Sequence, residues 1–171
     1  MLQGEKVKLT LVEKEGVAYL HDWLNDPEFT GEYEPFTPTT QRELERTYDR
    51  LEQEQWWFVE KDCGYKGFLS NSLRDGHQEL KFFTAPEERG NGYATEAVTL
   101  IVDHLFLNHD IIRIQAETHP ENTPAQKVLE KNGFTREATI RKNTFSGGTW
   151  RDTALYSLLR EEWTHARSKN V

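Results

Sequence analysis

A glycine-rich segment between a predicted strand and a predicted helix constrains the fold of this chain more than any other part of its sequence. Residues 86–95 read Pro-Glu-Glu-Arg-Gly-Asn-Gly-Tyr-Ala-Thr. Gly90 and Gly92 allow a tight turn and a close approach of the backbone to a ligand, and the helix that follows directs its free N–H groups to the same point. The segment lacks the Gly-Lys-Ser/Thr of a P-loop and the third glycine of the dinucleotide fingerprint. It therefore predicts either a phosphate-binding turn of another kind or a strand-to-helix turn that holds no ligand.

The hydrophobic pattern on both sides of this segment predicts one α/β domain over residues 1–171, without repeats or linkers. Alternating apolar residues indicate strands, and apolar residues at helical spacing indicate amphipathic helices. About seven strands and about four helices follow from these periods. The strands are expected at 5–12, 56–60, 65–73, 78–84, 111–118, 134–141 and 150–159, and the helices at 17–24, 39–54, 94–105 and 122–133.

Charge is distributed unevenly along the chain. The 171 residues include 21 Lys+Arg and 29 Asp+Glu, which gives a formal net charge of −8. Residues 1–60 hold 14 acidic and 6 basic residues, whereas residues 61–171 hold 15 of each, so the whole acidic excess lies in the first third. An acidic chain lacks the basic face that nucleic-acid binding needs. The excess is explained either by solvated helix faces or by a site that attracts a cationic partner.

Cysteine, histidine and apolar content exclude several other classes of protein. Cys63 is the only cysteine, so a disulfide framework and a thiolate zinc site are both excluded. The six histidines form no i, i+4 pair on a predicted helix, and we expect no metal. No apolar run approaches the ~18 residues of a membrane helix, and the first residues do not resemble a signal peptide. We therefore expect a cytoplasmic protein with neither a membrane nor a nucleic acid as its partner.

Several motifs, in order along the chain, resemble the GNAT acyltransferase superfamily. Arg89-x-x-Gly92-x-Ala94, which follows a strand and Pro86, is similar to the coenzyme A pyrophosphate loop of that family. The motifs downstream are similar to the RimJ/RimL-type branch, which acetylates the α-amino group of certain ribosomal proteins and includes enzymes that act on small amines. They are Pro120-Glu121-Asn122-x-x-Ala125, Val128-Leu129-x-Lys131-x-Gly133-Phe134, Arg141, Gly148, Asp152, Tyr156-Ser157-Leu158-Leu159 and Glu162-Trp163. The resemblance implies a single GNAT-like domain with a mixed, mostly antiparallel sheet that splays between the fourth and fifth strands.

The resemblance also implies that acetyl-CoA is the co-substrate and that a primary amine attacks it directly. Backbone N–H groups of the glycine-rich loop would hold the pyrophosphate, and the splayed strand would offer its main chain to the pantetheine arm and the thioester carbonyl. The side-chain amide of Asn122 would contact the cofactor, although an N-cap role alone also accounts for this residue. The residues expected to bind the cofactor are Phe83, Thr84, Arg89, Gly90, Asn91, Gly92, Tyr93, Ala94, Thr95 and Asn122.

Two carboxylates are candidate catalytic residues, because a protonated amine must lose a proton before it attacks. Glu79 shares a strand face with Lys81 and Phe83, near the expected thioester. Glu117 resembles the base of some relatives and would project from the fifth predicted strand. The alternatives are a cross-strand ion pair for Glu79 and a place on the rim for Glu117.

A general acid for the leaving thiolate is missing from its usual positions. Many relatives have a tyrosine one position after the equivalent of Val128, and the RimL type often has a serine where this chain has Ala125. The residue after Val128 is Leu129, which has no proton to donate. Either water, Tyr93 or Tyr156 assists the thiolate, or the protein binds or senses acyl-CoA without turnover.

The acceptor side of the family falls in the acidic first third of this chain, around Glu32, Tyr33 and Glu34. This position predicts a cationic acceptor, either a protein N-terminal α-amino group or a small cationic amine. Trp150 is a further candidate for the acceptor groove. A resistance enzyme that acetylates an antibiotic or toxin is another alternative. A homodimer is compatible with the implied fold, although no residue identifies an interface.

Overall fold

The sequence Trp-Trp-Phe-Val at residues 56–59 sends alternate side chains to opposite faces of a sheet and so divides the core in two. In the computed structural model, which describes residues 1–168, these residues lie on β3 (Glu54–Lys61) and all four are buried. Trp57 and Val59 join one core cluster, and Trp56 and Phe58 join the other. Both faces of the sheet are therefore covered by helices or by the loops that join them.

Eight strands form one sheet, in the order β1-β2-β3-β4-β5-β6-β8-β7. Neighbouring strands are antiparallel except for β5 and β6, which are parallel because the chain crosses over through a helix between them. The remaining strands are β1 (Leu2–Gln3), β2 (Lys8–Leu11), β4 (Gly64–Arg74), β5 (His77–Thr84), β6 (Arg113–Thr118), β7 (Thr135–Ser146) and β8 (Thr149–Leu159).

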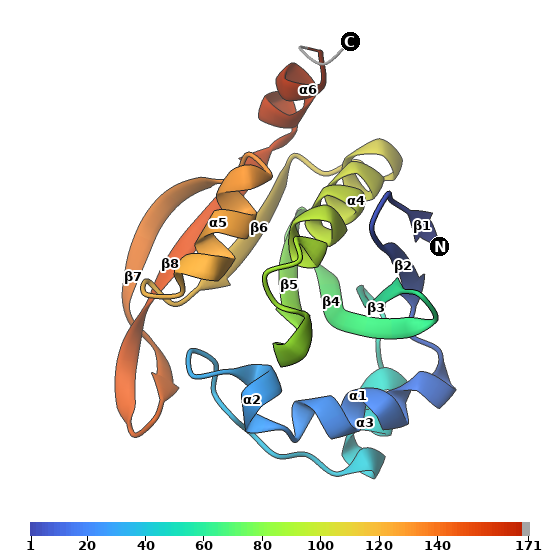
Figure 1. Ribbon diagram of the computed structural model, residues 1–171. Helices are drawn as coiled ribbons and strands as arrows, with labels where there is room; N and C mark the ends of the chain where they lie inside the picture. The colour runs from blue at the N-terminus through green and yellow to red at the C-terminus, as the bar shows by residue number, and fades with distance from the viewer. Residues whose placement is uncertain (169–171) are drawn as a thin grey trace.

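The helices lie in two groups. Figure 1 shows α1 (Val17–Leu24), α2 (Pro27–Thr30) and α3 (Gln41–Tyr48) at the lower end of the molecule, whereas α4 (Tyr93–Asn108) and α5 (Thr123–Lys131) cover the other side of the sheet. α6 (Arg160–Ser168) follows β8 directly, and short 3-10 helices occur at Lys14–Gly16 and Pro86–Glu88. The β7–β8 hairpin extends away from the body of the molecule, beside the loop that follows α2 (Figure 1).

The sheet splays where β5 and β6 separate. These strands pair only at Gln78↔Ile114 and Glu79↔Gln115, so the later residues of β5 have no partner on that side. The mixed, mostly antiparallel sheet with a gap between these two strands confirms the expected fold class. The structure has one strand more than expected, the two-residue β1, so the expected fourth and fifth strands correspond to β5 and β6.

The structure also corrects several boundaries. The helix expected at 39–54 ends at Tyr48, and the Gln53 carbonyl already accepts a hydrogen bond from the Leu73 N–H of β4 at 2.8 Å. The expectation of about four helices omits α2 and α6, since α2 has only four residues and α6 lies at the end of the chain. The single domain over 1–171 stays a prediction, and its last three residues lie outside the described part.

Candidate functional site

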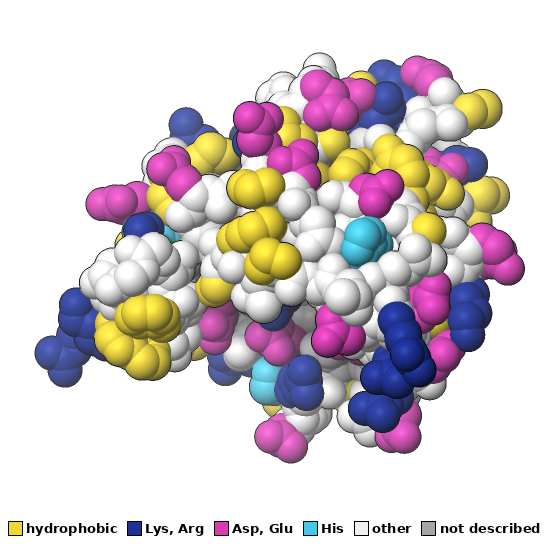
Figure 2. All heavy atoms as spheres, turned by 90° about the horizontal axis from the view of Figure 1, so that it is seen from below, with side chains coloured by type: hydrophobic (Ala, Val, Ile, Leu, Met, Phe, Trp, Pro, Cys, Tyr) yellow, Lys and Arg dark blue, Asp and Glu magenta, His cyan; other side chains and the backbone are white. Residues whose placement is uncertain are grey.

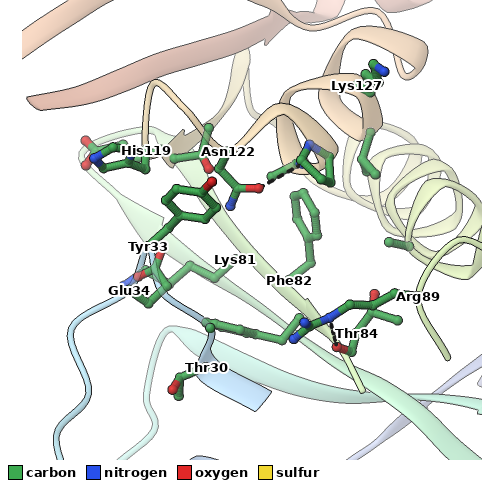
Figure 3. A pocket seen from close by; sticks show the side chains of 18 of the residues that line it. Thr30, Tyr33, Glu34, Lys81, Phe82, Thr84, Arg89, His119, Asn122 and Lys127 are labelled. Atoms are coloured by element: carbon green, nitrogen blue, oxygen red, sulfur yellow. Dashed lines mark hydrogen bonds between the residues drawn. The ribbon is translucent and has the colours of Figure 1, made fainter. Parts of the chain in front are cut away.

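A cleft of about 900 Å³ opens where β5 and β6 separate. Its walls come from α2 and the loop after it, β5, the glycine-rich loop with the first turn of α4, the end of β6, α5, and the part of the β7–β8 hairpin at Thr144 and Arg151–Thr153. Figure 3 shows side chains from these elements converging on one space. Most of the predicted site residues therefore share one cavity. They are Glu32, Tyr33, Glu34, Glu79, Phe83, Thr84, Arg89, Gly90, Gly92, Tyr93, Ala94, Thr95, Glu117 and Asn122.

The glycine-rich loop has the backbone that an anion requires. Gly90 and Gly92 have φ values of 82° and 81°, in the left-handed region that glycine adopts without strain. Gly92 is the N-cap of α4 and supplies no side-chain cap, so N–H groups of the first turn remain available beside the cleft. The loop therefore fits a pyrophosphate group.

Lysines behind the loop add positive charge and hold its shape. Lys66 forms an ion pair with Glu88 at 2.6 Å, with each side chain only 21% exposed. The Lys61 ammonium donates to the Tyr93 hydroxyl at 3.1 Å, and this bond raises the pKa of Lys61. Lys6 lies with its Nζ 3.5 Å from the Asn91 carbonyl oxygen. Three lysines thus lie beside the loop, and the charge of Lys66 is offset by its ion pair with Glu88.

The side chains of two predicted loop residues donate to main-chain carbonyls. Asn91 is absent from the cleft wall, and its side-chain amide donates to the Glu88 carbonyl at 3.1 Å. Arg89 lines the cleft, but its guanidinium donates to three main-chain carbonyls, those of Glu28, Phe29 and Thr84. Both side chains therefore shape the loop, whereas the anion-binding capacity lies in the backbone.

Asn122 combines the two roles that its sequence position suggests. It is the N-cap of α5, and its Oδ1 accepts a hydrogen bond from the Ala125 N–H at 3.3 Å (Figure 3). It also lines the cleft, where its Nδ2 is free to donate because the cap uses only the oxygen. The N-cap role is confirmed, and the contact with a cofactor stays a prediction.

The two candidate bases lie on opposite sides of the splay. Glu79, on β5, is 25% exposed and lies 3.7 Å from the Nε of Arg74, the cross-strand arrangement considered as its alternative role. Glu117, on β6, is exposed and accepts a weak 3.4 Å bond from the Asn143 amide. Both side chains line the cleft, so each can reach a water or an amine held there.

The loop after α2 forms an acidic wall of the cleft. Glu34 is half-buried; burial raises the pKa of its carboxyl group, Lys81 opposes this effect, and Glu117 adds to it. The Tyr33 ring stacks on His119, with 5.1 Å between ring centroids and 26° between planes. Burial and the Glu32 carboxylate raise the pKa of Tyr33, so its hydroxyl stays protonated at neutral pH. Figure 3 shows Tyr33, Glu34 and Lys81 close together on this side.

Trp150 is not brought together with these residues. It follows the Gly147–Gly148 turn of the β7–β8 hairpin, is 55% exposed, and packs edge-on against Phe145 with 5.5 Å between ring centroids. In Figure 2, hydrophobic side chains gather at the end of the lobe on the left. Trp150 does not line the cleft, although Arg151–Thr153 on the same strand do.

The structure shows where the candidate proton donors for the leaving thiolate lie. Leu129 is fully buried in the core, so its position has no access to the cleft. Tyr156 is 1% exposed, and its hydroxyl donates to Gln126 and Glu130 at 3.2 Å. Of the two tyrosines considered, only Tyr93 lines the cleft, on the first turn of α4.

Several cleft residues escaped the sequence analysis. Lys127 and Lys131 lie one turn apart on α5, are exposed, and line the same cleft as the glycine-rich loop. Their i, i+4 spacing after the Asn122 cap was a usable signal. Lys81 follows from the strand alternation that relates it to Glu79 and Phe83, whereas His119, after the end of β6, has no periodic pattern to mark it. Among residues 1–168, no group of three or more His, Cys, Asp and Glu is arranged to hold a metal. None of the helices in that range has both the length and the apolar character needed to cross a membrane.

Comparison with known proteins identifies the family. The family model "Acetyltransferase (GNAT) domain" matches residues 6–135. An uncharacterized N-acetyltransferase, p20 of Bacillus licheniformis, is 29% identical over 173 residues, which cover 95% of this chain and 97% of the relative.

Solved structures share the fold. The spermidine N-acetyltransferase of Vibrio cholerae, in complex with CoA and spermine, superposes with a TM-score of 0.85 at 20% identity, over 94% of this chain and 99% of that one. RimL, a ribosomal L7/L12 α-N-protein acetyltransferase in complex with coenzyme A, superposes with a TM-score of 0.82 at 15% identity, over 91% of this chain and 95% of that one. The resemblance noted in the sequence is thus confirmed, and the chain belongs to the GNAT acetyltransferase family as an acetyl-CoA-dependent N-acyltransferase.

Proposed function

We propose that this protein transfers the acetyl group of acetyl-CoA to a small cationic primary amine. One observation carries the proposal: a single cleft joins an anion-binding loop at one end to a wall of carboxylates at the other. The first end suits a pyrophosphate, and the second suits an amine that is positively charged in solution. The Vibrio cholerae relative, which acts on spermidine, has an acceptor of this chemical class.

The cofactor would be held along one side of the cleft. Backbone N–H groups of Gly90–Thr95 bind the pyrophosphate, and the main chain of Phe83 and Thr84 at the unpaired edge of β5 binds the pantetheine arm. The Asn122 Nδ2 donates to the same arm. Lys127 and Lys131 supply positive charge beside the loop for the 3′-phosphate.

Acetyl-CoA, when bound, supplies an acetyl thioester to the amine. The acidic wall attracts the ammonium form of the acceptor, and Glu79 or Glu117 takes its proton directly or through a water, because an alkylamine with a pKa near ~10.4 is almost fully protonated at neutral pH. A main-chain N–H at the end of β5 stabilises the negative charge that develops on the carbonyl oxygen. Water or the Tyr93 hydroxyl protonates the leaving thiolate, since Leu129 is buried and the Tyr156 hydroxyl is already donating elsewhere.

The reaction is tested by following free thiol release with acetyl-CoA and a panel of amines. The panel contains spermidine, an aminoglycoside and peptides with free N-termini. We expect the polyamine to give the largest kcat/KM. A preference for N-terminal peptides over every small amine would overturn the choice of acceptor, whereas absence of turnover with the whole panel would overturn the proposal itself.

The acidic wall is tested with a pair of charge-matched variants. Glu32→Gln/Glu34→Gln removes two carboxylates at the cleft, and Glu13→Gln/Glu15→Gln removes two exposed carboxylates outside the cleft lining. Both double variants change the net charge by the same amount, so a difference in KM between them reports the position of the carboxylates at the cleft. We expect KM for the amine to rise about tenfold in the first variant and to stay within about twofold in the second, as expected for two lost contacts of roughly 0.7 kcal/mol each.

A further inference from the structure

Arg89 connects the two halves of the cleft through main-chain hydrogen bonds. Its Nη2 donates to the Glu28 carbonyl at 2.7 Å and to the Phe29 carbonyl at 3.4 Å, and its Nε donates to the Thr84 carbonyl at 3.3 Å. One planar side chain thus links the glycine-rich loop to α2 and to the end of β5, and Figure 3 shows its bond to Thr84.

These contacts act on α2 together with the Asp26 cap and the buried Phe29 ring. The helix is four residues long, too short to be stable alone, and it ends at Thr30, shortly before the acidic wall. Phe29 is buried and stacks between Trp23 and Phe83, with centroid separations of 4.6 Å and 5.8 Å. The ring fixes one face of α2, and Arg89 fixes the carbonyls at its end.

We propose that Arg89 is a positioning residue that couples the cofactor loop to the amine-binding wall. An anion held by the backbone of Gly90–Thr95 restrains the loop and with it the Cα of Arg89. The guanidinium then restrains the carbonyls of Glu28 and Phe29, and the wall that carries Glu34 becomes more ordered. Because such coupling is reciprocal, acetyl-CoA strengthens amine binding by the same factor as the amine strengthens acetyl-CoA binding. This inference rests on the proposed function, and it assigns Arg89 to the acceptor wall in addition to the loop that it begins.

Arg89→Lys is the informative substitution. It keeps the positive charge but loses the planar fork that reaches three carbonyls. The matched control is Arg160→Lys, since Arg160 donates in the same way to main-chain carbonyls, those of Phe106 and Ile111 at 2.6 Å and 2.7 Å among them, but does not line the cleft. Thermal melts of both variants verify that they fold.

The readout is amide hydrogen exchange of residues 27–31, with and without saturating CoA, combined with calorimetric CoA affinity. The N–H groups of Phe29, Thr30 and Gly31 report α2 directly, because each is hydrogen-bonded within it or to Asp26. In the wild type and in Arg160→Lys, we expect CoA to slow this exchange about tenfold. In Arg89→Lys, we expect CoA affinity within about twofold of the wild type and no slowing of exchange.

Three results would overturn the inference. They are slowing of exchange that persists in Arg89→Lys, wild-type exchange in this segment that does not respond to CoA, and a tenfold or larger loss of CoA affinity in Arg89→Lys, which would make the guanidinium a phosphate ligand. A merely structural contribution of Arg89 changes exchange equally with and without CoA, so it leaves the CoA-dependent ratio intact. Failure of the wild type to bind CoA is a separate outcome that rejects the proposed function and is seen before any variant is made.

Discussion

A negative charge at Gly92 should weaken CoA binding through electrostatics alone, and the structure allows this effect to be isolated. Gly92 has a φ of 81° at the N-terminus of α4, where any side chain meets a conformational penalty of about 1–2 kcal/mol. Asn and Asp tolerate this region best and have the same size. Gly92→Asn and Gly92→Asp therefore share the strain and the bulk, and they differ only in charge.

The size of the difference follows from the expected distance. A carboxylate on Gly92 and a phosphate bound by the adjacent N–H groups would be about 6 Å apart, which corresponds to about 3 kcal/mol at an effective dielectric constant near 20 and about 0.7 kcal/mol in bulk water. A cleft open to solvent lies between these limits, so we expect CoA to bind about 10- to 50-fold more weakly to the Asp variant than to the Asn variant. A Cβ at this position would lie 3.2 Å from the Lys6 ammonium, which partly neutralises an aspartate and keeps the effect below the upper limit.

Isothermal calorimetry of CoA binding to the two variants measures this ratio, and melting temperatures verify that both are equally folded. Raising the salt concentration should reduce the ratio, since the interaction is electrostatic and partly exposed. Equal affinities of the Asn and Asp variants at low salt would refute the placement of the pyrophosphate at this loop.

Three further predictions test other parts of the structure. Lys127→Gln/Lys131→Gln should weaken CoA binding about tenfold and leave dephospho-CoA binding unchanged. The reason is the loss of two exposed contacts to the 3′-phosphate, of roughly 0.7 kcal/mol each. Calorimetry with CoA and with dephospho-CoA measures both affinities. Leu129→Ala should lower the free energy of unfolding by about 2–5 kcal/mol in urea titrations, since the side chain is fully buried in the larger core cluster. The raised pKa of Glu34 contributes stability that is present below the ordinary carboxyl range and is lost as pH rises through the raised value, so Glu34→Gln should gain stability over the wild type with increasing pH. Urea titrations of both proteins at about pH 4 and about pH 8 give this difference, and a constant or reversed difference contradicts the burial of Glu34.

Most of the sheet was predictable because its strands carry strong local patterns. The Trp-Trp-Phe-Val run of β3 and the turn at 61–64 predict the first hairpin, and the glycine pair at 147–148 predicts the last one. The end of α3 was not predictable in this way. Leu51 continues the apolar spacing of the helix, yet the chain leaves the helix after Tyr48, because the following residues reach β4 and pair with Leu73. Tertiary pairing here overrides the helical pattern.

Some parts of the site were likewise predictable from the sequence, and others were not. The anion-binding loop was predictable, because its function depends on local backbone geometry that glycine positions reveal. The partners of Arg89 were not, since Glu28 lies 61 residues away in the sequence and offers only a main-chain carbonyl, which leaves no trace in residue type. The stacking of Tyr33 on His119 joins two loops that no periodic pattern relates.

The acidic excess of the first third is best understood by asking which carboxylates are already engaged. Asp26 caps α2, Glu43 closes a capping box with Thr40, and Glu60 binds Lys8 at 2.9 Å. Hydrogen bonds from Thr40 lower the pKa of Glu43, so that carboxylate is stabilised by its own neighbours. Figure 2 shows acidic and basic side chains mixed over the face seen from below.

Glu32 and Glu34 differ from that group because they line the cleft. A cation that approaches an engaged carboxylate must compete with an existing partner, whereas one that enters the cleft meets Glu34, whose raised pKa indicates that its charge is incompletely compensated. Two explanations of the acidity thus apply to different residues. Exposed carboxylates at the surface account for most of the excess, and the small remainder at the cleft is where a protonated amine gains most from binding.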